Sequence, residues 1–156
     1  AAKGLYLIRD FDPDKPKHGY VMVQGSSSTV NLVSVLDRLE QDGVNVRVVA
    51  CISEELFHRQ SADYQNSVLP AEARYDLMVV TTGTRRVWPI QDPGPLTKEY
   101  SLVSDWDDQW LTGGSEADVI AEAHLDAESI YRGVKRFADE HDHRISSQAK
   151  QLADLQ

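Results

Sequence analysis

Three short apolar runs, each rich in β-branched residues, mark the first half of the chain. They read YVMVQ at 20–24, VNVRVVACI at 44–52 and YDLMVV at 75–80. Runs of this length and composition predict buried β-strands. Because the segments between them are too long for hairpins, the strands are expected to pair in parallel.

The segment between the first two runs has helical spacing instead. Val30, Val33, Leu36 and Leu39 recur every three residues, which predicts the apolar stripe of a helix. Gly43 follows and can close that helix in the left-handed conformation. Strand, helix and strand make a βαβ unit, in which the crossover is right-handed and the helix covers one face of the sheet. The predicted fold class is therefore α/β, a three-layer α/β/α sandwich with a mostly parallel sheet.

The second half repeats this pattern less regularly. The stretch EYSLVSD at 99–105 predicts a fourth strand. Ser115 and Asp126 are expected to cap the starts of two helices, because both residue types are preferred N-caps. The last of these helices should bury the stripe formed by Ile130, Val134 and Phe137.

The length and composition predict one domain. With 156 residues, 41% of them hydrophobic, the chain can bury a proper core, but a second domain would not fit. We expect a single domain at 1–142 and a polar C-terminal tail at 143–156. Within that domain, 1–19 is an entering segment that starts with a strand at Leu5 to Ile8.

Charge and cysteine content narrow the choice of partners and compartment. The formal net charge is −9 and the 16 basic residues are scattered, which argues against nucleic acid and anionic lipid as partners. No apolar stretch approaches the roughly 20 residues that span a membrane. The lone Cys51 is interpreted as a small buried hydrophobe. Because one cysteine provides no disulfide framework, a reducing cytoplasm is the predicted location.

One turn has features of a small-anion site. In VQGSSSTVNL, the residues Gly25, Ser26, Ser27 and Ser28 stand between a strand and a helix N-terminus, where N–H groups and the helix dipole favour an anion. The turn lacks the Lys of a P-loop. The simpler interpretation is that Ser27 or Ser28 caps the helix, because Ser is among the preferred N-cap residues.

No catalytic or metal-binding residue is assigned. The five histidines do not form a zinc-type pattern, and no serine lies on a G-x-S-x-G elbow. The acidic stretch around Asp105, Asp107 and Asp108 is interpreted as a packed loop with solvated carboxylates. Large aromatics in loops often anchor interfaces, and this chain has three there. They are Trp88, Trp106 and Trp110.

A longer motif, made of several segments in a fixed order along the chain, covers residues 20 to 70. A strand ends in Gly-Ser, an amphipathic helix follows, then a strand of the type G-[IV]-x-[VA]-R-V-V, and then E-L-F-x-x-Q-x-x-x-Y-x-x-S-V-L-P. The matching residues are Gly25, Ser26, Gly43, Arg47, Val48, Val49, Glu55, Leu56, Phe57, Gln60, Tyr64, Ser67, Val68, Leu69 and Pro70. This order resembles the C-terminal domain of transketolases and related thiamine-diphosphate enzymes. On this resemblance, the last segment is two short helical pieces that Pro70 stops, and its buried face consists of Leu56, Phe57, Tyr64, Val68 and Leu69.

The resemblance implies a domain that works inside a larger enzyme. The whole enzyme would transfer two-carbon ketol units between sugar phosphates, with thiamine diphosphate and a divalent cation (Mg) held between its first two domains. This chain would bind no cofactor and be inactive alone, since it lacks the diphosphate-binding Gly-Asp-Gly segment. It would serve folding and dimer assembly, with the other domains or subunits of a homodimer as partners. Two alternatives are the same domain from a homodimeric 2-oxoacid (pyruvate) dehydrogenase E1 component, and a free-standing small-anion-binding module.

Overall fold

One mixed sheet organises the protein. The computed structural model describes residues 2–84, 94–104, 111 and 113–154. In this part, five strands are arranged in the order β1-β3-β2-β4-β5. Their bounds are Leu5–Arg9 for β1, Tyr20–Gln24 for β2, Arg47–Cys51 for β3, Leu77–Thr81 for β4 and Leu102–Val103 for β5. The strands β2 to β5 pair in parallel, and only the edge strand β1 runs antiparallel, against β3.

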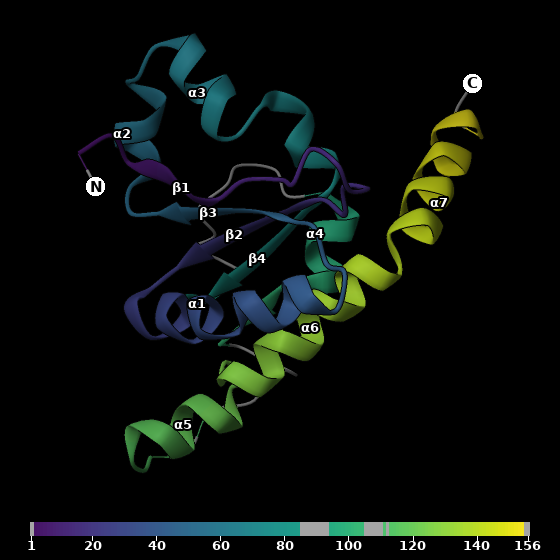
Figure 1. Ribbon diagram of the computed structural model, residues 1–156. Coiled ribbons are helices and arrows are strands. Elements are labelled where there is room, and N and C mark those ends of the chain that lie inside the picture. The colour runs from purple at the N-terminus through teal and green to yellow at the C-terminus, as the bar shows by residue number, and fades with distance from the viewer. Residues whose placement is uncertain (1, 85–93, 105–110, 112, 155–156) are drawn as a thin grey trace.

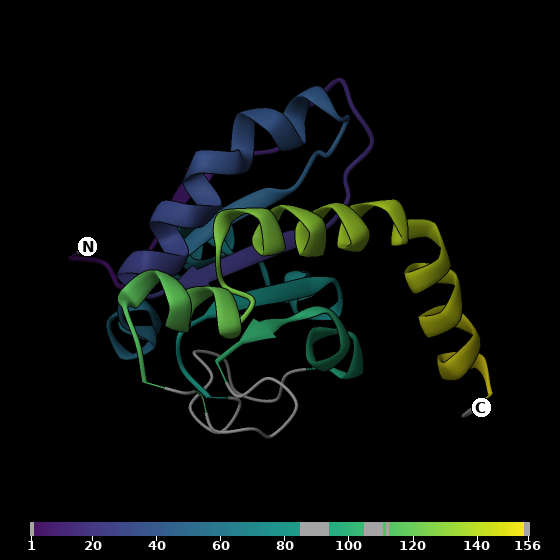
Figure 2. The same cartoon turned by 90° about the horizontal axis from the view of Figure 1, so that it is seen from below.

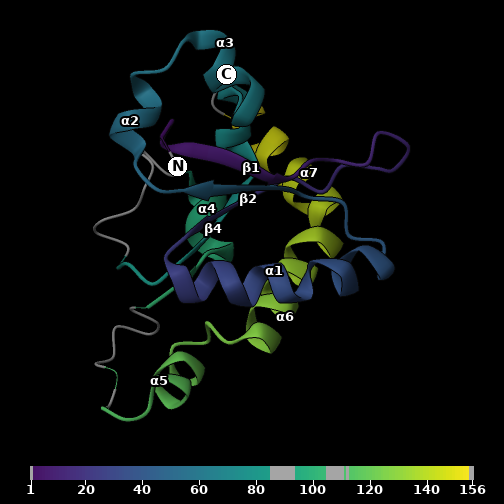
Figure 3. The ribbon, with the colours of Figure 1, turned by 60° about the vertical axis from the view of Figure 1, so that its left-hand side comes forward.

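Helices cover both faces of this sheet (Figure 1). The helices are α1 (Ser26–Gln41), α2 (Glu54–His58), α3 (Ala62–Val68), the 3₁₀-helix η1 (Ala71–Tyr75), α4 (Pro95–Tyr100), α5 (Glu116–Glu122), α6 (Ala127–Asp139) and α7 (His141–Ala153). The pair α1 and α6 packs on one face, and α2 and α3 lie on the other beyond β1 and β3 (Figure 3). The predicted three-layer α/β/α architecture is confirmed.

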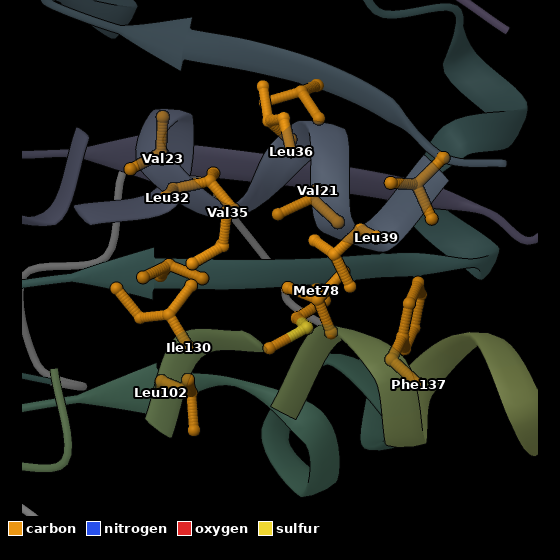
Figure 4. Packing of buried hydrophobic residues seen from close by; sticks show 14 of the residues in the cluster. Val21, Val23, Leu32, Val35, Leu36, Leu39, Met78, Leu102, Ile130 and Phe137 are labelled. Carbon is orange, nitrogen blue, oxygen red and sulfur yellow. The ribbon is translucent and has the colours of Figure 1, made fainter. Parts of the chain in front are cut away.

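The two faces of the sheet belong to two separate apolar clusters. Along β2, Val21 and Val23 point into the cluster under α1 and α6, whereas Met22 points into the cluster under α2 and α3. This alternation follows from the two-residue period of a strand. Figure 4 shows Leu32 and Phe137 meeting β2 and β4 side chains in the larger cluster. The parallel strands are buried on both sides, which explains their continuous apolar runs.

Helix α1 buries a different stripe from the predicted one. Val30 is 67% exposed and Val33 is 47% exposed, so the prediction was wrong for these two residues. The buried face is Ser28, Leu32, Val35, Leu36 and Leu39. The reason is geometric: a strict spacing of three drifts around a helix of 3.6 residues per turn, whereas 32, 35, 36 and 39 stay on one side.

The predicted helix ends are confirmed. Gly43 adopts φ +78° directly after α1. The side chain of Ser115 accepts a hydrogen bond from the Asp118 N–H, and the Asp126 carboxylate accepts two, so both residues cap helices as expected. The stripe of α6 is fully buried at Ile130, Val134 and Phe137.

The predicted fourth strand at 99–105 is largely wrong. Its first residues belong to α4, which ends at Tyr100, and the strand is only the two-residue β5. Pro95 starts this helix at a position that favours proline. The turn after it is fixed by the buried Ser101 hydroxyl, which accepts a hydrogen bond from the Val79 N–H at 2.9 Å.

The segment before β4 forms the two predicted helical pieces, but Leu56 is 39% exposed, so its predicted burial was wrong. Ser53 caps α2 and Ser61 caps α3 through their side chains. Helix α3 ends at Val68, and Pro70 then begins η1. Phe57 and Val68 are buried against the sheet, so this segment covers the apolar cluster to which Met22 belongs.

The C-terminal residues form a helix that leaves the body. Helix α7 turns away from α6 and projects beyond the sheet (Figure 2). The predicted boundary between 1–142 and 143–156 falls inside this helix, and Arg144, on the tail side, is buried against the domain. The division into domain and tail stays a prediction.

Candidate functional site

The predicted anion-binding residues lie at the junction of β2 and α1. Gly25 is the N-cap, and Ser26, Ser27 and Ser28 form the first turn of the helix. Gly25 has φ +97°, and a Cβ there would lie 2.6 Å from Thr82 Oγ1, so this turn requires glycine. The arrangement presents the positive end of the α1 dipole at the carboxyl edge of the sheet.

Neither Ser27 nor Ser28 caps α1, so that prediction was wrong. No side chain caps this helix; the Thr29 hydroxyl instead donates to the Gly25 carbonyl at 2.7 Å. The helix begins early enough that the serines fall inside its first turn and not before it. Ser28 is fully buried, and its hydroxyl has no hydrogen-bond partner among the residues that the structure describes. Anion binding at Gly25 to Ser28 stays a prediction.

This junction lies where the chain changes direction across the sheet. From β2 the chain passes through α1 to β3, and from β3 it returns through α2 and α3 on the opposite face to β4. Open α/β sheets bind ligands in a crevice at the point where the connections from adjacent strands leave toward opposite sides of the sheet. At this edge, Thr81 Oγ1 donates to Gln24 Oε1 at 3.0 Å and accepts from the Gly83 N–H at 2.9 Å.

The remaining candidate chemistry is limited. Within the described part of the chain, no group of three or more His, Cys, Asp or Glu residues could hold a metal ion. Cys51 is buried, and burial raises the pKa of its thiol to about 11, which confirms it as a small buried hydrophobe. The acidic residues 105, 107 and 108 and the three tryptophans lie outside the described residues.

A buried ion network, which the sequence does not indicate, fixes the start of α7. Arg144 is 1% exposed, and its Nη2 and Nε lie 2.6 and 3.1 Å from Asp76 Oδ1. Its Nη2 also donates to the His18 carbonyl at 3.2 Å. The guanidinium lies 3.7 Å from the Phe137 ring centroid. Arg144 therefore connects α7 to the start of β4 and to the segment before β2.

Two histidines adjoin this network. The rings of His18 and His141 are 5.9 Å apart, and His141 Nε2 is 3.5 Å from Asp76 Oδ2. His18 Nδ1 accepts a hydrogen bond from the Asn45 N–H at 3.1 Å. Burial, followed by the nearby His141, lowers the pKa of His18. Both histidines look isolated in the sequence, because more than a hundred residues separate them.

A match to a family model shows which protein family this chain belongs to. The model for the transketolase-like C-terminal domain matches residues 4–91. The chain belongs to the transketolase C-terminal domain family. This match includes β1 to β4 and confirms the resemblance carried by the motif between residues 20 and 70.

Curated transketolases match a little under half of the chain. The chloroplastic transketolase of Solanum tuberosum is 38% identical over 73 residues, which is 46% of this chain and 9% of the relative. The transketolase of Streptococcus pyogenes is 35% identical over 69 residues, 44% of this chain and 9% of the relative. The chain thus aligns with about a tenth of the length of the curated transketolases it matches.

Solved transketolases share the fold over more of the chain. The transketolase from Leishmania mexicana superposes with a TM-score of 0.64 over 90% of this chain and 18% of that protein, at 21% identity. The enzyme from Campylobacter jejuni superposes with a TM-score of 0.56 over 84% of this chain, at 16% identity. At these identities the similarity shows the fold alone. It therefore extends the transketolase C-terminal fold into the second half of the chain, beyond the family match.

Proposed function

We propose that this chain acts as the non-catalytic C-terminal domain of a transketolase and serves folding and dimer assembly. The observation that carries this proposal is the family match over residues 4–91, together with the small share of each relative that the chain covers. The parent enzyme would transfer two-carbon ketol units between sugar phosphates in carbohydrate metabolism. Its other domains would be the partners of this chain, within a homodimer.

The described residues do not fit the cofactor of such an enzyme. The sequence has no Gly-Asp-Gly segment, and the described part of the chain offers no cluster of ligands for a divalent cation. Thiamine diphosphate and its metal ion are therefore assigned to the rest of the parent enzyme. The polar side chains at the carboxyl edge of β2 and β4 bond to each other, as a packed structural edge would.

An exposed apolar flank supports the assembly role. Tyr6 on the edge strand β1 is 37% exposed, and it lies on the face that α1 covers, because it pairs with Ala50. Arg9 of the same strand bonds to α1 near its C-terminal half, so β1 runs along this helix. Val30 and Val33 are exposed on α1 as well. Apolar residues gathered in this way mark surfaces that pack on other protein, here another part of the parent enzyme.

Two other functions are less well supported. The curated relatives described above are transketolases and not 2-oxoacid dehydrogenases, which favours the first proposal. A small-anion function at Gly25 to Ser28 is favoured by the partnerless buried hydroxyl of Ser28. Titration with inorganic phosphate, followed at the amide of Ser28 in the chain and in Ser28→Ala, tests that function.

Location in the cell also stays a proposal. We propose the cytoplasm, although the matching transketolases include chloroplastic and bacterial enzymes. Among the described residues, no helix combines the length and the apolar character that crossing a membrane requires.

An activity assay on the isolated chain tests the non-catalytic role. The purified chain should transfer no two-carbon units from a ketose phosphate, with thiamine diphosphate and Mg²⁺ supplied. A complete transketolase assayed in parallel shows that the conditions support turnover. Thiamine-dependent turnover by the chain alone would overturn the proposal.

A further inference from the structure

A hollow lies between α4, β5 and α6. Another hollow, of about 310 Å³, is larger, but the smaller one has the more distinctive arrangement of charged side chains. It has a volume of about 240 Å³, and its lining includes Arg132, Arg136, Glu99, Tyr100 and Leu102. Residues of α6 and β5 line it, and Figure 2 shows the yellow-green α6 passing beside the green arrow of β5. Gly133 lets the two elements approach, since a Cβ there would lie 2.9 Å from Leu102 Cδ1.

Arg132 faces this hollow without a carboxylate partner among the described residues. The carboxylate one turn before it, Glu128, is bound to Arg38 at 2.7 Å. The carboxylate at the end of α6, Asp139, is bound to Lys135 at 2.5 Å. The one hydrogen bond of Arg132 within the described part is a long contact of 3.4 Å to Ser129 Oγ.

The next turn of α6 adds a second guanidinium. Arg136 lies four residues after Arg132, a spacing at which like charges destabilise a helix. Arg136 is itself held by Glu140 at 3.1 Å and Glu99 at 3.6 Å. Because Arg136 already has two carboxylate partners, Arg132 is the guanidinium of this lining that remains without one in the described part of the chain.

We propose that this hollow binds the carboxylate group of a small organic acid, with Arg132 as the residue that recognises it. A guanidinium matches the two oxygens of a carboxylate with a pair of parallel hydrogen bonds. One guanidinium without a carboxylate partner suits a monoanion, because Glu99 and Glu140 oppose a second negative charge. Leu102 and the Tyr100 ring supply an apolar wall for a short hydrocarbon part of the acid.

Titration of the ¹⁵N-labelled chain with butyrate tests this site by NMR. The amides of Arg132, Gly133 and Leu102 should shift in a saturable way, with a dissociation constant on the order of 1 mM. Arg132→Gln should weaken binding about tenfold, because a charge-assisted pair is lost. Arg59→Gln is the matched control, since Arg59 is exposed on another face and makes no ion pair in the described part of the chain. It should leave the affinity unchanged.

Three results would overturn the site. These are shifts that do not saturate, an equal loss of affinity in both arginine variants, or butyramide, the neutral isostere, binding as well as butyrate. Inorganic phosphate is a further probe, and tighter binding of phosphate than of butyrate would refute the assignment to a monocarboxylate. A matching amide spectrum of the unliganded Arg132→Gln chain shows that the fold is intact, so that lost binding reports on the site itself.

Discussion

Arg144 is the largest fully buried side chain among the described residues. A buried guanidinium is tolerated only when carboxylate and carbonyl oxygens satisfy it, and here Asp76, His18 and Phe137 supply them. The network joins three segments that are distant in the sequence. Arg144 therefore contributes strongly to the packing of α7, together with Gln148, which donates to the Tyr75 carbonyl at 2.8 Å.

Arg144→Ala should destabilise the protein by about 3–5 kcal/mol, because Asp76 would lose the guanidinium that lies 2.6 Å away while it remains mostly buried. Urea unfolding followed by circular dichroism measures this change. Arg74→Ala is the control, since Arg74 is exposed on η1, and it should change stability by less than about 0.5 kcal/mol. Equal stability of the two variants would show that the network does not hold α7.

His18 should make stability depend on pH. Its pKa in the folded protein is below the ordinary value of 6.5, chiefly because of burial, then because of His141 and Arg144, while Asp139 and Asp142 oppose this. Between the two pKa values the unfolded chain binds more protons, so stability rises with pH and is lost as pH falls below about 6.5. Protonation would also end the hydrogen bond that Nδ1 accepts from the Asn45 N–H.

Replacement of His18 tests this dependence. In His18→Gln, the decline of unfolding free energy from about pH 8 to about pH 5 should be smaller than in the unchanged chain. Val33→Ala serves for comparison, because this side chain is 47% exposed and does not titrate, so the profile should stay as it is. An identical profile in the His18 variant would contradict the lowered pKa.

Helix α1 carries apolar residues on two sides and buries one of them. Leu32 is fully buried between the sheet and α6, whereas Val33, the next residue, is 47% exposed. Leu32→Ala should cost about 2–5 kcal/mol through lost burial and a cavity, and Val33→Ala less than about 0.5 kcal/mol. Thermal unfolding of the two variants measures this difference. Similar costs would mean that α1 sits on the sheet in another rotation.

These elements also show how far the sequence predicts the fold. The apolar runs predicted β2, β3 and β4, and Gly43 and Asp126 predicted helix ends correctly, because each depends on local chemistry. The face that α1 buries and the extent of β5 depend on tertiary packing, which periodicity alone does not resolve. Residues 99–105 have strand composition, yet Pro95 starts a helix that runs into them.

The candidate sites were predictable to different degrees. The turn at Gly25 to Ser28 is visible in the sequence because it is contiguous. The contact of Arg144 with Asp76 spans 68 residues. The place of Arg132 beside Leu102 and Glu99 depends on how α6 packs against α4 and β5. No short sequence motif indicates either arrangement. The structure is needed to bring these residues together.

The molecule as a whole has the features of a part made for a larger assembly. Its family match is a transketolase C-terminal domain, and β1 and α1 expose apolar side chains at one flank. The net charge of −9 opposes self-association of the isolated chain at low salt. Burial of this flank in the parent enzyme would remove its apolar surface from water.

Sedimentation of the parent transketolase with and without residues 4–153 tests the assembly role most directly. The complete enzyme should sediment as a dimer, and the truncated enzyme should dissociate or unfold at the same concentration. Tyr6→Ser combined with Val33→Ser in the complete enzyme should weaken the dimer or lower its melting temperature. A truncated enzyme that remains dimeric, with unchanged melting temperature, would contradict the proposed role of this domain.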